Sequence, residues 1–286
     1  MKIIIAIMLV LNWTLLFAQV SSNEDTSAAI TATALDYADG FYSGAPERME
    51  RAIHPDLNKV FVVKLSATAK PSLQYSTYSG LIELTRAKVG FREQEKRNIK
   101  ATILAVNGDL ASVKLTSPMF NDFLQMVNVE GKWKIVNVLW EPGPESPNNP
   151  QHGNIDVENE KKTISSTVND YYTGSFTNDV ALLEKTIYPE MRIAQFTKLP
   201  QTGKPFISRV GFGMITEAVR AKLRQVPENQ QKVDVKILDV MDEMAFVEAI
   251  TPMSTNYIQL AKMDEQWKII NILNKSNPNT QQQGKK

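Results

Sequence analysis

Apolar residues near the start of the chain recur with the spacing of an amphipathic helix. The stripe consists of Ile30, Ala34, Tyr37, Ala38 and Phe41. This spacing places the five side chains on one face of a helix. A polar residue in the segment 25–27 is expected to cap that helix, and Gly40 falls where the helix should end. A second helix is expected from Pro46 until Pro55 terminates it, and a third from about residue 79 to residue 90.

The segment that follows changes from helical spacing to the alternation of β-strands. Residues 99–106 and 110–115 flank the dipeptide Asn107-Gly108. Asn-Gly tolerates the positive φ values of a tight turn, so the pattern predicts a β-hairpin. A second hairpin is expected to turn at Glu130-Gly131.

The strand after Glu130-Gly131 is apolar on both of its faces. Simple alternation assigns Trp133, Ile135 and Leu139 to one face. It assigns Val136, Val138 and Trp140 to the other face. Because a strand that is apolar on both sides needs two covers, helices are expected on one face of the sheet and a second sheet on the other.

The whole pattern occurs twice in one constant frame. The segment 30–140 reappears 134 residues later, from residue 164 onward, without a gap. The matched runs are Asp36–Gly40 with Asp170–Gly174, Ile53–Leu57 with Ile187–Met191, Arg86–Lys88 with Arg220–Lys222, and Trp133–Leu139 with Trp267–Leu273. Self-similarity at a fixed offset is the sign of a tandem duplication. In the second copy, helices are expected from residue 164, between residues 178 and 189, and over residues 214–224.

The repeat divides the chain into two α+β domains, each with a curved antiparallel sheet and about three helices. We expect the first domain at 26–141 and the second at 161–275. Between them, residues 142–160 are rich in proline, glycine and polar residues, which is typical of a linker. The tail 276–286 has a similar composition and is expected to be disordered. Packing of the two sheets against each other would make the chain a monomer with an intrachain pseudo-dimer.

The N-terminus resembles a secretory signal peptide. Lys2 precedes an apolar run from Ile3 to Phe17, and the small residue Ala18 follows. We expect cleavage between Ala18 and Gln19, a loosely ordered lead-in over 19–29, and an exported protein, periplasmic or secreted. The apolar run is too short to favour stable membrane insertion. The chain contains no cysteine, so a fold in that compartment would need no disulfide.

The charge balance and the motifs narrow the function classes. Lys plus Arg number 32 and Asp plus Glu 31, for a net charge of +1, and no long run of one sign is present. A nucleic-acid partner is therefore not expected. The chain has two histidines, and His152 falls in the predicted linker, so no metal site is expected. A glycine-rich phosphate loop is also missing from the sequence, and no cofactor is predicted.

Three motifs of the first copy resemble the lumazine-binding branch of the nuclear transport factor 2 superfamily. They are Ala52–Asp56, Asn121–Met126 and Glu130–Val136, which are close to that branch's apolar-His-Pro-Asp, Asp-Tyr-Leu and Gly-Lys-Trp-Lys-Ile-Val patterns. The second copy departs from them at Tyr188, Asn256 and Glu265. The resemblance implies cone-shaped domains. The superfamily includes isomerases, dehydratases, cargo binders and association modules, so fold alone selects none of these functions.

Three residues of the first copy are candidates for catalysis. His54 could transfer a proton at neutral pH, with Asp56 or Asp36 as its partner. The alternative is a structural histidine at a helix end, where its ring satisfies backbone groups. Asp122 could act as a general base, or it could bind nearby backbone amides in a turn.

Six aromatic residues are candidates for contact with a ligand. They are Tyr37, Tyr78, Trp133, Tyr171, Tyr188 and Trp267. Tyr37 and Tyr171 could present a hydroxyl group to a pocket, and the tryptophans could stack on a flat ligand. The alternative for all six is an amphipathic residue of the core.

Two functions of different class follow. The first is an exported protein that binds a small apolar molecule or another protein, without catalysis. The second is a cofactor-free isomerase or dehydratase that acts on a small apolar carbon acid, with His54 as the proton-transfer residue. The position of His54 distinguishes them: an imidazole and an acid facing one cavity would favour the enzyme. An imidazole bonded only to surface backbone would not.

Overall fold

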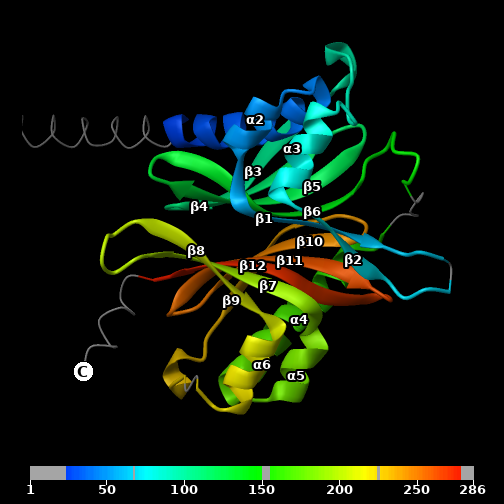
Figure 1. Cartoon of the computed structure of the whole chain (residues 1–286). Helices are drawn as coiled ribbons and strands as arrows, with labels where there is room; N and C mark the ends of the chain where they lie inside the picture. The colour runs from blue at the N-terminus through cyan, green and yellow to red at the C-terminus, as the bar shows by residue number, and fades with distance from the viewer. Residues whose placement is uncertain (1–23, 67, 150–154, 224–225, 278–286) are drawn as a thin grey trace, which may run out of the picture.

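The computed structural model describes residues 24–66, 68–149, 155–223 and 226–277. Two α+β domains lie one above the other, and each is built on a six-stranded sheet (Figure 1). The predicted signal peptide, its predicted cleavage site and residues 278–286 of the C-terminal tail lie outside the described residues. None of the helices in the described ranges is long and apolar enough to span a membrane.

The first domain begins with a helix that is described over residues 24–43. Its other elements are α2 (Pro46–Ala52), β1 (Ile53–Val63), β2 (Ser72–Ser76), α3 (Tyr78–Arg86), the short 3₁₀ helix η1 (Gln94–Lys96), β3 (Lys100–Asn107), β4 (Leu110–Thr116), β5 (Phe120–Val129) and β6 (Lys132–Pro142). The strand order is β2-β1-β6-β5-β4-β3. Neighbouring strands are antiparallel except for β1 and β6, which are parallel.

The second domain repeats this order. Its elements are α4 (Val157–Thr177), α5 (Val180–Thr186), β7 (Ile187–Lys198), β8 (Pro205–Gly211), α6 (Phe212–Arg220), η2 (Glu228–Gln230), β9 (Asp234–Val240), β10 (Met244–Ile250), β11 (Ser254–Met263) and β12 (Gln266–Ser276). The pairing of Ile53 with Ile135 recurs as that of Ile187 with Ile269, each shifted by 134 residues. The predicted duplication is therefore confirmed. Helix α4 begins at Val157, inside the segment predicted as linker.

Local sequence explains some of the boundaries, but the first helix continues past Gly40 to residue 43, and α2 ends at Ala52, so that Pro55 lies in β1. Pro46 occupies the first turn of α2, as predicted. Gly108 and Gly131 have φ values of +58° and +84°, and both predicted hairpins are confirmed. Two predictions for the N-terminal segment were wrong. Residues 24–29 are helical rather than part of a loosely ordered lead-in, and the segment 25–27 lies inside the helix and does not cap it. Helix α3 ends at Arg86 rather than near residue 90.

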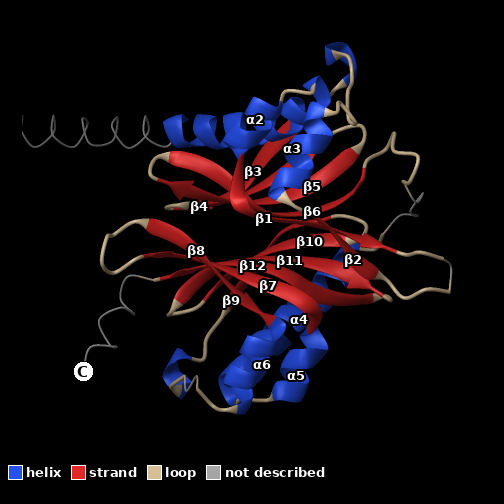
Figure 2. Cartoon of the chain, in the orientation of Figure 1, coloured by secondary structure: helices blue, strands red, loops and turns tan. Residues whose placement is uncertain are grey.

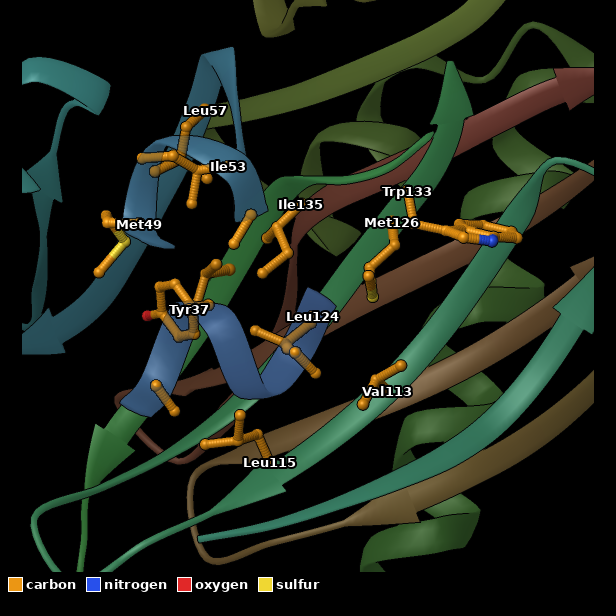
Figure 3. Packing of buried hydrophobic residues seen from close by; sticks show 14 of the residues in the cluster. Tyr37, Met49, Ile53, Leu57, Val113, Leu115, Leu124, Met126, Trp133 and Ile135 are labelled. Carbon is orange, nitrogen blue, oxygen red and sulfur yellow. The ribbon is translucent and has the colours of Figure 1, made fainter. Parts of the chain in front are cut away.

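The two sheets pack face to face, with the helices on the outer face of each sheet (Figure 2). One core fills the space between the helices and the sheet in each domain. The first of these cores includes Tyr37, Met49 and Trp133 (Figure 3). A third core lies between the sheets and combines Phe123, Val136 and Leu139 of the first domain with Phe246 and Leu273, among others, of the second. The predicted intrachain pseudo-dimer is therefore confirmed.

A β-bulge corrects the predicted facing of β6. Gln125 pairs with Asn137 and Met126 with Ile135, so Val136 is the extra residue. A bulge reverses the alternation beyond it. Leu139 therefore lies between the sheets with Val136, whereas Val138 and Trp140 join Trp133 and Ile135 on the helix side. The assignments of Leu139, Val138 and Trp140 by simple alternation were wrong.

Buried amides tie the two sheets together with pseudo-twofold symmetry. Gln125 donates through Nε2 to the Tyr257 carbonyl, and Gln259 donates to the Phe123 carbonyl, both at 2.6 Å. These partners are again 134 residues apart. Asn137 donates to Oε1 of Gln125, and Asn271 donates to Oε1 of Gln259. Because buried polar groups require partners, this network fixes the register of one sheet on the other.

Candidate functional site

A cavity of about 140 Å³ opens between the helices and the sheet of the first domain. It is lined by Tyr37, Phe41, Met49, Lys59, Ser76, Leu81, Leu84, Phe120 and Trp140. Most of these side chains are aromatic or aliphatic. A larger groove of about 820 Å³ lies where the domains meet, and its walls include Lys64, Glu243 and Lys262. The smaller cavity has the more distinctive chemistry, because a buried charge forms part of its wall.

That charge belongs to Lys59, which forms a cluster with Tyr37 and Asp122. Lys59 is 8% exposed and Asp122 is fully buried. The Lys59 ammonium donates to Oδ1 of Asp122 at 2.9 Å and to the hydroxyl oxygen of Tyr37. The Tyr37 hydroxyl in turn donates to Oδ1 of Asp122 at 3.1 Å. Oδ2 of Asp122 has no hydrogen-bond partner among the described residues.

Aromatic rings surround the Lys59 ammonium. Nζ lies 4.8 Å from the ring centre of Trp140, 5.2 Å from that of Tyr37 and 5.7 Å from that of Phe120. These distances are within the range of cation–π attraction. The indole nitrogen of Trp140 is also buried without a hydrogen-bond partner among the described residues. The cavity wall therefore combines apolar surface with polar atoms that are not all satisfied.

Adjacent strands bring the charged pair together. Lys59 on β1 lies opposite Val138 of β6, and Asp122 on β5 lies opposite Trp140 of the same strand. The bulge in β6 directs Val138 and Trp140 to the helix side, next to both charged residues. Tyr37 reaches the pair from the N-terminal helix. The site therefore depends on one helix, three strands and one bulge.

Burial shifts the titration of all three groups. It lowers the pKa of Lys59, against the opposing attraction of Asp122. It raises the pKa of Asp122, against the stabilising charge of Lys59. Burial, followed by the charge of Asp122, raises the pKa of Tyr37 well above its usual range. The first two shifts reflect the cost of burying charge, and the attraction between the ammonium and the carboxylate opposes both of them.

The second domain lacks this cluster. Ile193 replaces Lys59, Asn256 replaces Asp122 and Asn274 replaces Trp140, whereas Tyr171 preserves the tyrosine. The Asn256 side chain donates to the Ala249 carbonyl and accepts from the amide of Asn274. The two domains share one backbone but differ in chemistry.

The structure separates His54 from Asp122. His54 is the second residue of β1, and its Nδ1 accepts a hydrogen bond from the backbone N–H of Asp56 at 3.1 Å. The Asp56 carboxylate is 3.7 Å from the same nitrogen and is 58% exposed. His54 does not line the cavity. Burial lowers the pKa of His54, and Arg209 of the second domain and Lys134 contribute to the shift.

The other proposed partner of His54 is engaged elsewhere. Asp36 forms ion pairs with Arg48 and Arg51 on α2. The hydrogen-bond partner of the His54 ring is therefore a backbone group, as the structural alternative predicted. The alternative placed His54 at a helix end, however, whereas His54 lies in a strand and accepts from an N–H group.

The six aromatic candidates have different surroundings. Of them, Tyr37 alone lines the cavity. Tyr78 and Trp133 pack in the first core, and Tyr171 and Trp267 pack in the second. The indole N–H of Trp267 donates to Glu160 at 2.6 Å.

Tyr188 packs against the core between the two sheets. Its hydroxyl donates to the Pro71 carbonyl at 3.4 Å. The structure therefore brings together Tyr37 and Asp122, two of the residues that the sequence indicated.

Lys59 and Trp140 are site residues that were not predicted from the sequence. A lysine within the run Leu57–Val63 is ordinarily an exposed strand residue, and alternation assigned Trp140 to the opposite face. The repeat contained a sequence signal for the charged pair. The frame that aligns the two copies matches Lys59 with Ile193 and Asp122 with Asn256. A pair of opposite charges that is replaced by two neutral residues in the sister copy indicates a pair in contact.

Metal ligation has no support in the described ranges. No group of three or more His, Cys, Asp or Glu side chains in them could hold a metal ion. The polar groups that line the cavity are the amine of Lys59, the phenol of Tyr37 and the hydroxyl group of Ser76, and the carboxyl group of Asp122 contacts the first two.

Comparison with solved structures gives matches that each cover less than half of this chain. An NTF2-like protein from Silicibacter pomeroyi is 20% identical over 42% of this chain and 98% of its own, with a TM-score of 0.36. An NTF2-like protein from Cytophaga hutchinsonii is 14% identical over 41% and 98%, with a TM-score of 0.33. A protein described as a "Putative Scytalone Dehydratase" from Novosphingobium aromaticivorans is 12% identical over 46% and 99%, with a TM-score of 0.34.

The search of curated proteins found no match. The family model described as "Putative lumazine-binding" matches residues 25–141 and again residues 159–274. These two ranges coincide with the two domains of the structure and together cover most of the chain. The protein therefore belongs to this family and consists of two tandem α+β domains.

Proposed function

We propose that the first domain binds a small, mostly apolar molecule that carries one oxygen acceptor. The observation that supports this most directly is the buried Lys59 ammonium in a cavity wall of aromatic rings. Burying a charge costs free energy, and apolar replacements are often equally stable. A buried lysine in a cavity wall therefore supports a role in binding. The second domain demonstrates that this backbone accommodates Ile193 at the same place.

The cavity limits the size of the ligand. An engineered apolar cavity of about 150 Å³ binds benzene, so a volume of about 140 Å³ suits one six-membered ring or a molecule of similar size. Phe120 and Trp140 provide flat surfaces. The partly exposed Leu84 lies in the same wall and provides a route to solvent.

The polar groups specify one end of the ligand. The Lys59 ammonium uses two of its three N–H groups on Asp122 and Tyr37, which leaves one donor beside the apolar walls. A carbonyl, phenol or carboxylate oxygen would accept from that donor. The ligand class proposed here is therefore a small cyclic or aromatic molecule with an oxygen substituent.

The second domain supports the first in this proposal. Its sheet covers the inner face of the first sheet. At the positions of Lys59 and Asp122 it has the uncharged residues Ile193 and Asn256. The isomerase or dehydratase hypothesis required His54 in the cavity, and we do not adopt it because His54 lies outside the lining.

We also propose that the protein is exported. Lys2, the apolar run and Ala18 support this. N-terminal sequencing of the protein from culture supernatant or periplasm is expected to begin at Gln19. An intact Met1 on that protein would contradict the proposal.

Fluorine NMR with 4-fluorobenzyl alcohol tests the binding proposal. The probe resonance is expected to broaden and shift with the wild-type protein. Trp140→Asn, which copies the residue of the second domain, should abolish the effect. Tyr37→Phe should weaken it, whereas the matched Tyr171→Phe in the second domain should not. Equal losses from the two tyrosine variants would overturn the assignment of the site to the first domain.

A further inference from the structure

The cavity contains an amine in surroundings that suit covalent chemistry. Lys59 is the single lysine among the lining residues, and its Nζ lies within 6 Å of three ring centres. Burial disfavours the ammonium form, against the attraction of the rings and of Asp122, and a neutral amine is a nucleophile toward carbonyl carbon. The shift in the pKa of Lys59 has the same direction.

Two groups that can transfer protons contact the Lys59 nitrogen. Oδ1 of Asp122 is 2.9 Å from Nζ, and the Tyr37 hydroxyl contacts both groups. Formation of an imine needs one group that removes a proton from nitrogen and returns it to oxygen, and it needs a second donor that holds the oxygen. A carboxylate and a phenol in contact with the amine meet that requirement.

We propose that Lys59 captures a small aldehyde as a Schiff base in this cavity. The inference rests on the proposed function, since the aldehyde occupies the site that we assign to the ligand. Its carbonyl carbon faces the Lys59 nitrogen, and its oxygen accepts a hydrogen bond from the Tyr37 hydroxyl once that hydroxyl releases Asp122. The apolar part of the aldehyde packs between Phe120 and Trp140.

The reaction is balanced without a further reactant. The ammonium passes one proton to Asp122, and the nitrogen lone pair then forms a C–N bond as the C=O π pair moves to oxygen. The proton that nitrogen loses passes through Tyr37 to that oxygen, which gives a carbinolamine. Asp122 returns its proton to the hydroxyl group, the C–O bond breaks, and water leaves as the C=N bond forms. The products are a protonated imine and water, and the Asp122 carboxylate is restored as its counter-ion.

Another lysine provides a matched control. Burial also lowers the pKa of Lys134, yet its Nζ donates to the carbonyls of Glu50 and Arg51 and does not line the cavity. If a depressed pKa alone caused reactivity, Lys134 would react as well. If the cavity causes it, Lys59 reacts preferentially.

Reductive trapping tests the proposal on the full-length protein. The wild-type protein is incubated with benzaldehyde and sodium cyanoborohydride at pH 7, and benzylated lysines are mapped by peptide mass spectrometry. Lys59 is expected to be labelled faster than any other lysine, since the cavity holds the aldehyde beside its nitrogen and burial favours the free amine. Lys134→Arg should leave that label unchanged. 4-Fluorobenzyl alcohol should compete with labelling of Lys59.

The outcomes separate this inference from the proposed function. Binding of 4-fluorobenzyl alcohol without preferential labelling of Lys59 would overturn the Schiff base and leave the binding site intact. A lack of both binding and labelling would overturn both proposals. Mapping the label in the wild-type protein does not depend on whether a variant folds.

Discussion

The buried pair of Lys59 and Asp122 makes a strong prediction about stability, because the second domain provides its natural replacement. Lys59→Ile copies Ile193 and leaves Asp122 fully buried without its cation. Asp122→Asn copies Asn256 and leaves the Lys59 ammonium without its anion. Removal of one partner of a buried ion pair costs about 3–5 kcal/mol.

The double variant Lys59→Ile/Asp122→Asn should recover most of this loss. It contains no unpaired charge, and replacing both members of a buried pair is often neutral or stabilising. We expect each single variant to lose about 4 kcal/mol and the double variant to lose less than about 1 kcal/mol. For a chain of this size, the single losses correspond to a decrease of roughly 10 °C in melting temperature.

Urea unfolding monitored by circular dichroism and by tryptophan fluorescence measures these free energies. The loss of unfolding free energy in Lys59→Ile should also depend on pH. A lone buried Asp122 has a pKa above its unfolded value, so the native state binds the extra proton and its stability decreases as pH rises through the folded pKa. Losses below about 1 kcal/mol in both single variants, or a double variant as unstable as the sum of the singles, would refute the reasoning.

Three further predictions concern other parts of the fold. Burial, with Asp242 and Glu243 nearby, raises the pKa of Glu141 from 4.5 to about 7. The stability of the fold should therefore decrease as pH rises from 4.5 to 7, because the folded state holds this proton more tightly than the unfolded state. Glu141→Gln should remove up to about 3 kcal/mol of this pH dependence, as measured by urea unfolding at several pH values. Gln125→Leu should cost about 2–3 kcal/mol by leaving the Tyr257 carbonyl and the Asn137 amide unpaired, and the pseudo-symmetric Gln259→Leu should cost as much; losses that differ severalfold would contradict the symmetry. His54→Ala should lower the melting temperature by a few degrees at most and leave 4-fluorobenzyl alcohol binding unchanged, and lost binding would restore His54 to the site.

The sequence by itself determined the architecture. The constant offset of 134 residues predicted two domains, and Asn107-Gly108 predicted a hairpin, because tight turns depend on a few local residues. The apolar residues on both faces of β6 predicted a helix layer on one side and a second sheet on the other. These features come from periodicity and backbone preference, which act over short stretches of chain.

The tertiary structure alone decided the site. The bulge at Val136 depends on how β5 pairs with β6, and it directs Trp140 into the cavity rather than between the sheets. Lys59 and Tyr37 are 63 and 85 residues from Asp122 in sequence. A charge becomes buried only where distant partners compensate it, so no local pattern distinguishes Lys59 from an ordinary surface lysine. His54 was prominent in the sequence, but the strand that carries it turns its ring toward the backbone of Asp56 and away from the cavity lining.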